Sequence, residues 1–315
     1  MNGMPLASFE TQVPGKWILA GEHSVLRGCP ALVFPLESRS LSLAYQDKVS
    51  QGLTLELAGD HGEELQLLVW GVLEKACQLS KVSRADLRGV LRAHSSIPVG
   101  AGLGASAALC VGIAQWFLAM KLITTNQLYE FARTLENLFH GESSGVDIAV
   151  ALSRSPLRFS RSGERASIEV RWQPHCYVSY SGKRGVTLEC VNKVKSLLES
   201  NPKLGERIDQ DMAQAVNLAQ QALSSEEIQG LPLLKSSMDL AYTCFERWGL
   251  CVESHVEWLR QQGALAIKPT GSGGGGYVLS LWEKEPPLEV RKLLIPCFES
   301  GAKPAINSSQ YLASE

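Results

Sequence analysis

The stretch "SSIPVGAGLGASAALCVGIAQWFLAM" (residues 95–120) places glycines at alternate positions directly before a long apolar segment. Gly100, Gly102 and Gly104 weaken regular structure, because glycine loses more backbone freedom on folding than any other residue. Backbone N–H groups can turn inward in such a loop, and the following helix adds unpaired N–H groups and the positive end of its dipole. The stretch therefore predicts an anion cradle for a di- or triphosphate, with a turn that only caps a buried helix as the alternative.

The loop differs from a Walker A loop, because no Gly-Lys-Ser/Thr follows it. Ser106 lies early in the helix expected over residues 104–121, and its hydroxyl is placed to ligate Mg²⁺ beside a bound phosphate. A plain capping role explains the same serine equally well.

Composition limits the classes of partner. The chain has 315 residues, 45% of them hydrophobic and 20% charged, which predicts about two domains with buried cores. A net charge of −2 gives no general reason to expect binding to nucleic acid or to an anionic membrane. Eight cysteines without a C-x-x-C pair favour reduced core thiols over a zinc site. With no leader-like N-terminus and no apolar run of about 20 residues, we expect a cytoplasmic protein.

The hydrophobic periodicity predicts an α+β protein of two domains, residues 1–170 and 171–315. Expected strands cover residues 17–20, 31–37, 41–45, 53–58, 87–94, 263–269 and 277–282, with further strands around 165–180. Expected helices cover residues 63–79, 104–121, 125–140, 144–152, 187–200, 205–223, 227–248, 251–262 and 287–296.

A second motif, "PGKWILAGEHSVLRGCPAL" (residues 14–32), puts Lys16 at the head of a strand and Glu22 and His23 in the turn that follows. Loops that flank strands are where functional polar groups collect. Taken singly, Lys16 is more often a solvated lysine at a strand end, and His23 is more often an ordinary turn residue.

A third motif, "LENLFHGESSGVDIAVAL" (residues 135–152), carries Glu136 and Asp147 eleven residues apart. That spacing is about three helical turns, so the two carboxylates can share one face or converge across a break. Two carboxylates beside a phosphate cradle suit magnesium-assisted phosphoryl transfer. In the alternative, Glu136 is solvated and Asp147 makes only a local cap or pair.

A fourth motif, "KPTGSGGGGYVLSL" (residues 268–281), holds five glycines between two expected strands. An ordinary hairpin needs only one or two, so the loop predicts close approach to a ligand or to the other domain. A flexible loop tip is the alternative.

Together and in this order, the motifs resemble those of the GHMP kinase superfamily from Pro14 to Tyr277. "PGKWILAGEHSVLRGCPAL" and "HGESSGVD" are most similar to the patterns of the mevalonate kinases. The resemblance implies an N-terminal domain like the second domain of ribosomal protein S5 and a ferredoxin-like C-terminal domain.

The resemblance also implies roles. Asp147 would be the catalytic base, with Lys16 orienting the reacting hydroxyl and lowering the pKa of Asp147. Ser106 and Glu136 would hold Mg²⁺, and Glu22, His23 and, in a looser alignment, Thr187 would lie by the substrate. The backbone of Gly100, Ala101, Gly102, Leu103, Gly104, Ala105 and Ser106 would cradle the phosphates of ATP.

Three positions depart from the family pattern. Ala105 replaces the first of two serines after Gly-Leu-Gly, Ser143 stands where proline is usual, and Ile148 stands where asparagine commonly follows the aspartate. The last two lie on the substrate side of the motifs, so they bear on which acceptor is used rather than on the nucleotide.

The expected activity is transfer of the ATP γ-phosphoryl group to mevalonate. A phosphomevalonate kinase is one alternative, for which Lys183 and Arg184 could supply basic groups to a phosphorylated acceptor. A non-catalytic nucleotide sensor is another, although it would have no need of a base beside a lysine. The resemblance also makes a homodimer a candidate assembly.

Overall fold

The computed structural model describes residues 6–48, 52–58, 62–162 and 165–298. The chain divides into two compact units: unit 1 is Met1–Gly15, Arg39–Val99 and Gly104–Leu152, and unit 2 is Lys16–Ser38, Gly100–Leu103 and Ser153–Glu315. The units are interleaved along the chain, so they do not test the expected division at residue 170, which remains a prediction.

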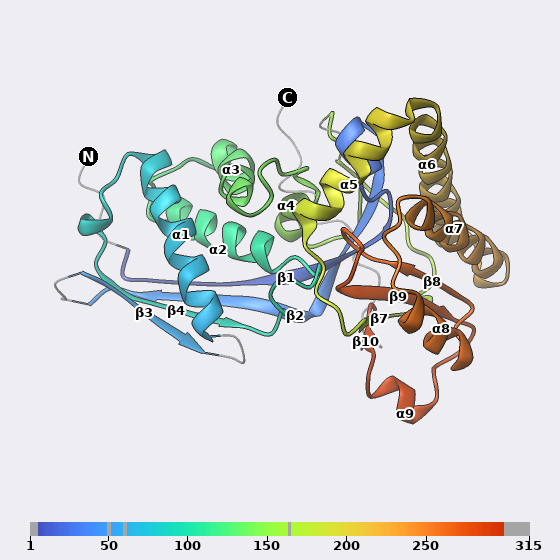
Figure 1. Cartoon of the computed structure of the whole chain (residues 1–315). Helices are drawn as coiled ribbons and strands as arrows, with labels where there is room; N and C mark the ends of the chain where they lie inside the picture. Colours follow the sequence, from blue (N-terminus) through green and yellow to red (C-terminus); the bar gives the residue numbers. More distant parts are fainter. Residues whose placement is uncertain (1–5, 49–51, 59–61, 163–164, 299–315) are drawn as a thin grey trace. The chain divides into compact units, whose positions relative to one another are not determined.

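Strands and helices occur in both units, which confirms the α+β class (Figure 1). The strands are β1 (Ser8–Ala20), β2 (Ala31–Gln46), β3 (Leu53–Ala58), β4 (Gly89–Ser95), β5 (Leu157–Phe159), β6 (Arg165–Ser167), β7 (His175–Tyr180), β8 (Ala266–Pro269), β9 (Tyr277–Trp282) and β10 (Ile295–Pro296). The α-helices are α1 (Gly62–Ser80), α2 (Ala105–Ala119), α3 (Leu128–His140), α4 (Val146–Ser153), α5 (Thr187–Ser200), α6 (Pro202–Ser224), α7 (Glu227–Arg247), α8 (Glu253–Gln261) and α9 (Leu288–Arg291). Short 3₁₀ turns are η1 (Ser24–Arg27), η2 (Arg84–Asp86) and η3 (Thr125–Gln127).

Unit 1 is a sheet covered by helices. Strand β4 pairs in parallel with β3 and antiparallel with residues 41–46 of β2, and α1 makes the crossover that a parallel pair requires. Helix α2 is apolar on almost every side, as expected for a buried helix. Its Gly112 lets it approach β2 closely, since a Cβ there would lie 3.4 Å from the Leu41 side chain. The apolar stretch that follows the glycine loop is therefore the centre of this unit's core.

Unit 2 contains the antiparallel sheet β10-β7-β9-β8 and a long helical hairpin. The hairpin helices α6 and α7 lie side by side (Figure 1), and the hydroxyl of Ser237 on α7 donates to the carbonyl of Ala215 on α6 over 2.7 Å. Helices α7 and α8 pack against β8. Buried side chains between helices and sheet include Tyr177, Tyr242, Val256, Leu259, Ile267, Val278, Trp282, Val290 and Leu294.

Two sequence-based expectations were wrong in detail. Residues 31–37 and 41–45 belong to one continuous strand, β2, because residues 38–40 continue it without a turn. The helix expected over 287–296 is only α9, four residues long, and residues 295–296 pair with β7 instead. In both cases strand pairing decides the local structure, which periodicity alone does not report.

The eight cysteines are free thiols, and six of them are buried. Burial raises the pKa of the Cys244 thiol to about 12, so it stays protonated at neutral pH. Within the part of the chain that the structure describes, no helix is both long enough and apolar enough to cross a membrane.

Candidate active site

The glycine loop before α2 has a backbone that demands glycine. Gly100, Gly102 and Gly104 have φ of +68°, +84° and +83°, in the left-handed region that side-chain-bearing residues avoid. Gly104 is the residue before α2, and no side chain caps this helix end. The loop thus leads to a helix end whose first N–H groups receive no side-chain cap, a common setting for anion binding.

The second glycine loop packs directly on the first within unit 2. The N–H of Tyr277 donates to the carbonyl of Ala101 over 3.2 Å. An added Cβ would lie 2.8 Å from the Ala101 oxygen at Gly276, and 3.3 Å from the Thr270 oxygen at Gly102. The glycines of residues 271–276 therefore permit contact between two backbones, which agrees with the predicted close approach and not with a flexible tip.

Arg184 is a neighbour of the loop whose position there the sequence did not predict. A Cβ on Gly100 would lie 2.9 Å from two nitrogens of the Arg184 guanidinium, so this exposed cation rests against the loop backbone. Nearby, the Gly276 N–H donates to the Lys183 carbonyl over 2.7 Å, which ties the segment that bears Arg184 to the second glycine loop.

Lys16 and Glu22 are both buried in unit 2, with 4% and 2% of their surface exposed. The Lys16 N–H donates to the Leu103 carbonyl over 2.9 Å, which fixes β1 against the glycine loop. Glu22 forms an ion pair with Lys268, whose Nζ lies 2.5 Å from Oε1. Burial raises the pKa of Glu22, while the Lys268 ammonium, then the backbone N–H of Glu22 itself and then the Lys16 ammonium act against that rise. Lys268 received no role from sequence reasoning, although it heads the fourth motif.

His23 and Thr187 meet the same residue, Ser272, in the second glycine loop. His23 Nε2 lies 2.9 Å from the Ser272 carbonyl, and Thr187 Oγ1 lies 3.4 Å from the Ser272 hydroxyl. The His23 ring packs edge-on against Trp248, with the ring centroids 5.0 Å apart. Burial lowers the pKa of His23 to about 4, so the ring is neutral at pH 7 and Nε2 carries the proton donated to the carbonyl.

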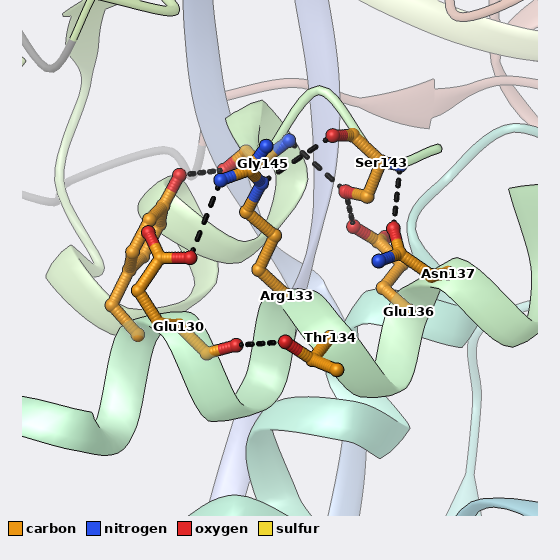
Figure 2. A network of polar contacts seen from close by, with 8 residues as sticks. Glu130, Arg133, Thr134, Glu136, Asn137, Ser143 and Gly145 are labelled. Carbon is orange, nitrogen blue, oxygen red and sulfur yellow. Dashed lines mark hydrogen bonds and ion pairs between the residues drawn. The ribbon is translucent and has the colours of Figure 1, made fainter. Parts of the chain in front are cut away.

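Glu136 and Ser143 form a buried polar cluster in unit 1 (Figure 2). Glu136 is 2% exposed, which excludes the solvated alternative for this carboxylate. The Ser143 hydroxyl donates to Glu136 Oε2 and accepts from the Gly145 N–H over 3.0 Å. The Ser143 N–H donates to Asn137 Oδ1 over 2.8 Å. Ser143, a departure from the family pattern, therefore orients the carboxylate predicted to hold magnesium.

Asp147 and Ser106 each lie in the first turn of a helix in unit 1. Asp147 is on α4 and Ser106 on α2, and both are half-buried. Gly145, just before α4, has φ of +80°, and its carbonyl accepts from the Tyr129 hydroxyl over 3.3 Å. The turn that presents Asp147 is thus fixed from both sides, by Tyr129 and by Ser143.

The predicted site residues therefore fall into two groups. Unit 2 brings together Lys16, Glu22, His23, Thr187 and the loop Gly100–Leu103, while unit 1 holds Gly104, Ala105, Ser106, Glu136 and Asp147. The approach of Lys16 to Asp147 stays a prediction, because the two residues belong to different units.

Comparison with known proteins gives consistent matches. The family model described as the GHMP kinases N terminal domain matches residues 68–155. A mevalonate kinase of Aeropyrum pernix is 30% identical over 306 residues, which cover 92% of each chain. One from Thermococcus sibiricus is 29% identical over 295 residues, which cover 85% of this chain and 87% of the relative. The crystal structure of L. major mevalonate kinase in complex with R-mevalonate aligns with a TM-score of 0.75 at 22% identity, over 93% of this chain and 92% of that one.

Proposed function

This chain belongs to the GHMP kinase family and has its two-domain α+β fold, and we propose that it phosphorylates mevalonate at the expense of ATP. The product is 5-phosphomevalonate, an intermediate of isoprenoid precursor synthesis. The observation that carries the proposal is similarity to mevalonate kinases along nearly the whole chain, 92% of both sequences in the Aeropyrum pernix case.

The chemistry is a direct in-line transfer. Asp147 accepts the proton of the primary hydroxyl, the hydroxyl oxygen attacks the γ-phosphorus, and the bond to the bridging oxygen breaks to release ADP. Because the transition state is loose, positioning and charge neutralisation contribute more to the rate than proton removal. Lys16 orients the acceptor hydroxyl, and the loop 100–106 holds the phosphates through backbone N–H groups.

Magnesium fits the residues assigned to it. Carboxylate and hydroxyl oxygens are ligands that Mg²⁺ accepts, and Glu136 is buried with its carboxylate oriented by Ser143. Glu136 and Ser106 would hold the ion, which when bound neutralises charge on the β- and γ-phosphates. Arg184, which rests on Gly100, adds a further positive charge at the loop.

The test is ADP release by the purified protein, with mevalonate, phosphomevalonate, galactose and homoserine offered separately. We expect turnover with mevalonate alone. Asp147→Asn should lower kcat at least about a hundredfold and leave nucleotide affinity unchanged. Turnover with phosphomevalonate alone would favour the phosphomevalonate kinase alternative, and ATP binding without turnover on any acceptor would favour the sensor.

Cytoplasmic location and homodimer formation belong to the same proposal. Light scattering of the purified protein at several concentrations tests the dimer, because a monomer mass at every concentration would contradict it.

A further inference from the structure

Lys268 is the most deeply buried charged side chain among the residues described, with 0% of its surface exposed. It lies on β8, and its ammonium has a neighbour for each of its N–H groups. Nζ donates to Glu22 Oε1 over 2.5 Å and to the Ile18 carbonyl over 3.3 Å, and it lies 5.4 Å from the centre of the Phe245 ring. Lys268 is therefore satisfied within unit 2 and has little capacity left to bind a ligand itself.

Its partner Glu22 is satisfied at only one oxygen. Oε1 accepts from Lys268, whereas Oε2 is buried and receives no hydrogen bond from any residue that the structure describes. Leaving a buried acceptor unpaired destabilises the folded protein, and the cost is larger for a charged group. Lys268 is paired, whereas only one oxygen of the Glu22 carboxylate is. This arrangement is expected when the unpaired oxygen, Oε2, accepts a hydrogen bond from a ligand.

We propose that Lys268 is a positioning residue, which fixes Glu22 so that Oε2 accepts a hydrogen bond from a hydroxyl of the acceptor alcohol. This inference rests on the proposed function for the identity of that alcohol. The cluster of Lys16, Lys268 and Glu22 carries one net positive charge, which suits an acceptor that bears a carboxylate.

The first experiment is a double-mutant cycle with Lys268→Met, Glu22→Gln and the combined variant. Each single variant should lower kcat/KM for mevalonate about 10- to 100-fold and leave the KM for ATP within about twofold. Because Lys268 acts through Glu22, the combined variant should fall no more than about threefold below Glu22→Gln alone. Losses that multiply would overturn the inference.

Lys235→Met is the matched control. Lys235 on α7 forms an ion pair with Asp239 over 2.6 Å, but both side chains are about half exposed, at 48% and 50%. The same substitution there should leave kcat/KM for mevalonate unchanged. Lys268→Met could fail to fold, because it leaves the Glu22 carboxylate buried without a counterion. The combined variant removes that charge, so its kcat/KM can still be compared with that of Glu22→Gln alone.

The second experiment follows the protonation of Glu22. The groups that face it are Lys268 from β8, Lys16 from β1 and the Cys244 thiol from α7, which stays protonated at neutral pH. Removal of Lys268 should raise the pKa of Glu22, so the acidic limb of the kcat/KM profile should move up by about one pH unit or more. A merely structural role for Lys268 would lower activity without moving the limb.

Infrared difference spectra give the same information without a substrate. The carbonyl band of a protonated carboxyl should appear at pH 7 in Lys268→Met and be missing from the combined variant. If the band appears but the wild-type protein does not phosphorylate mevalonate, the proposed function fails while the pairing of Lys268 with Glu22 stands. If the band does not appear, the inference fails whatever the substrate.

Discussion

Gly276→Ala tests whether the contact between the two glycine loops is needed for nucleotide binding. Gly276 has φ of +73°, and a Cβ there would lie 2.8 Å from the carbonyl oxygen of Ala101 in the first glycine loop. An alanine in this conformation costs about 1–2 kcal/mol before any contact is considered. The contact adds to this cost, because the opposing atom is backbone and cannot rotate away.

The size of the contact effect follows from the geometry. Ordinary contact begins near 3.4 Å, so the two loops must separate by about 0.6 Å. The hydrogen bond from the Tyr277 N–H to the Ala101 carbonyl, already 3.2 Å long, does not survive such a movement. Loss of one such bond corresponds to about 0.5–1.5 kcal/mol, so we expect a rise of about 3- to 10-fold in the Kd for ATP.

Gly263→Ala is the control. Gly263 follows α8 with φ of +102°, but a Cβ there would lie 3.9 Å from its nearest neighbour, the Trp282 ring. Both variants should lose stability in urea unfolding, whereas only Gly276→Ala should weaken ATP binding measured by calorimetry. Unchanged ATP binding in Gly276→Ala, or equal weakening in Gly263→Ala, would show that the contact between the loops does not shape the phosphate site.

Three further predictions concern the remaining site residues. Glu136→Gln should raise the magnesium concentration needed for half-maximal activity by about tenfold or more. Ser143→Ala should raise it less, because only the orientation of the carboxylate is lost. Identical magnesium titrations for wild type and both variants would contradict these roles. The pKa of His23 is about 4 in the folded protein and 6.5 in the unfolded chain. Between these pH values the unfolded state binds more protons than the folded state. The free energy of unfolding should therefore fall by about 3 kcal/mol as the pH drops from 6.5 to 4. Unfolding curves of His23→Gln should lack that component, whereas the exposed control His94→Gln should keep it. Thr187→Val should raise the KM for mevalonate about 3- to 10-fold with ATP unaffected, and an unchanged acceptor KM would remove Thr187 from the substrate site.

The glycine motifs allowed more to be predicted than the polar ones did. The alternate glycines predicted an irregular loop before the helix, and the left-handed backbone at Gly100, Gly102 and Gly104 agrees with it. Close approach of the loop at 271–276 was the favoured prediction, because an ordinary hairpin needs only one or two glycines, and the structure bears it out over the flexible tip. The sequence did not predict which backbone segment the loop at 271–276 would contact. That contact depends on the pairing of β8 with β9 and on the course of β1.

The polar residues show where sequence reasoning stops. Ser143 departs from the family pattern, where proline is usual, and the structure shows that its hydroxyl joins Glu136 to the Gly145 N–H. A proline there could provide neither the hydroxyl nor the N–H that Asn137 accepts. The serine therefore orients the carboxylate with hydrogen bonds, which a proline could not supply.

Lys268 illustrates the same limit more strongly. In the sequence it stands near the end of a short apolar strand, where a lysine is ordinarily solvated. Its counterion, Glu22, lies 246 residues earlier, and only the folded chain places the two side chains in contact. Lys268 is buried and paired, whereas one carboxylate oxygen of Glu22 has no hydrogen-bond partner among the described residues. The sequence motif thus points to Glu22 as a candidate site residue, whereas only the three-dimensional structure shows that Lys268 is the side chain paired with it.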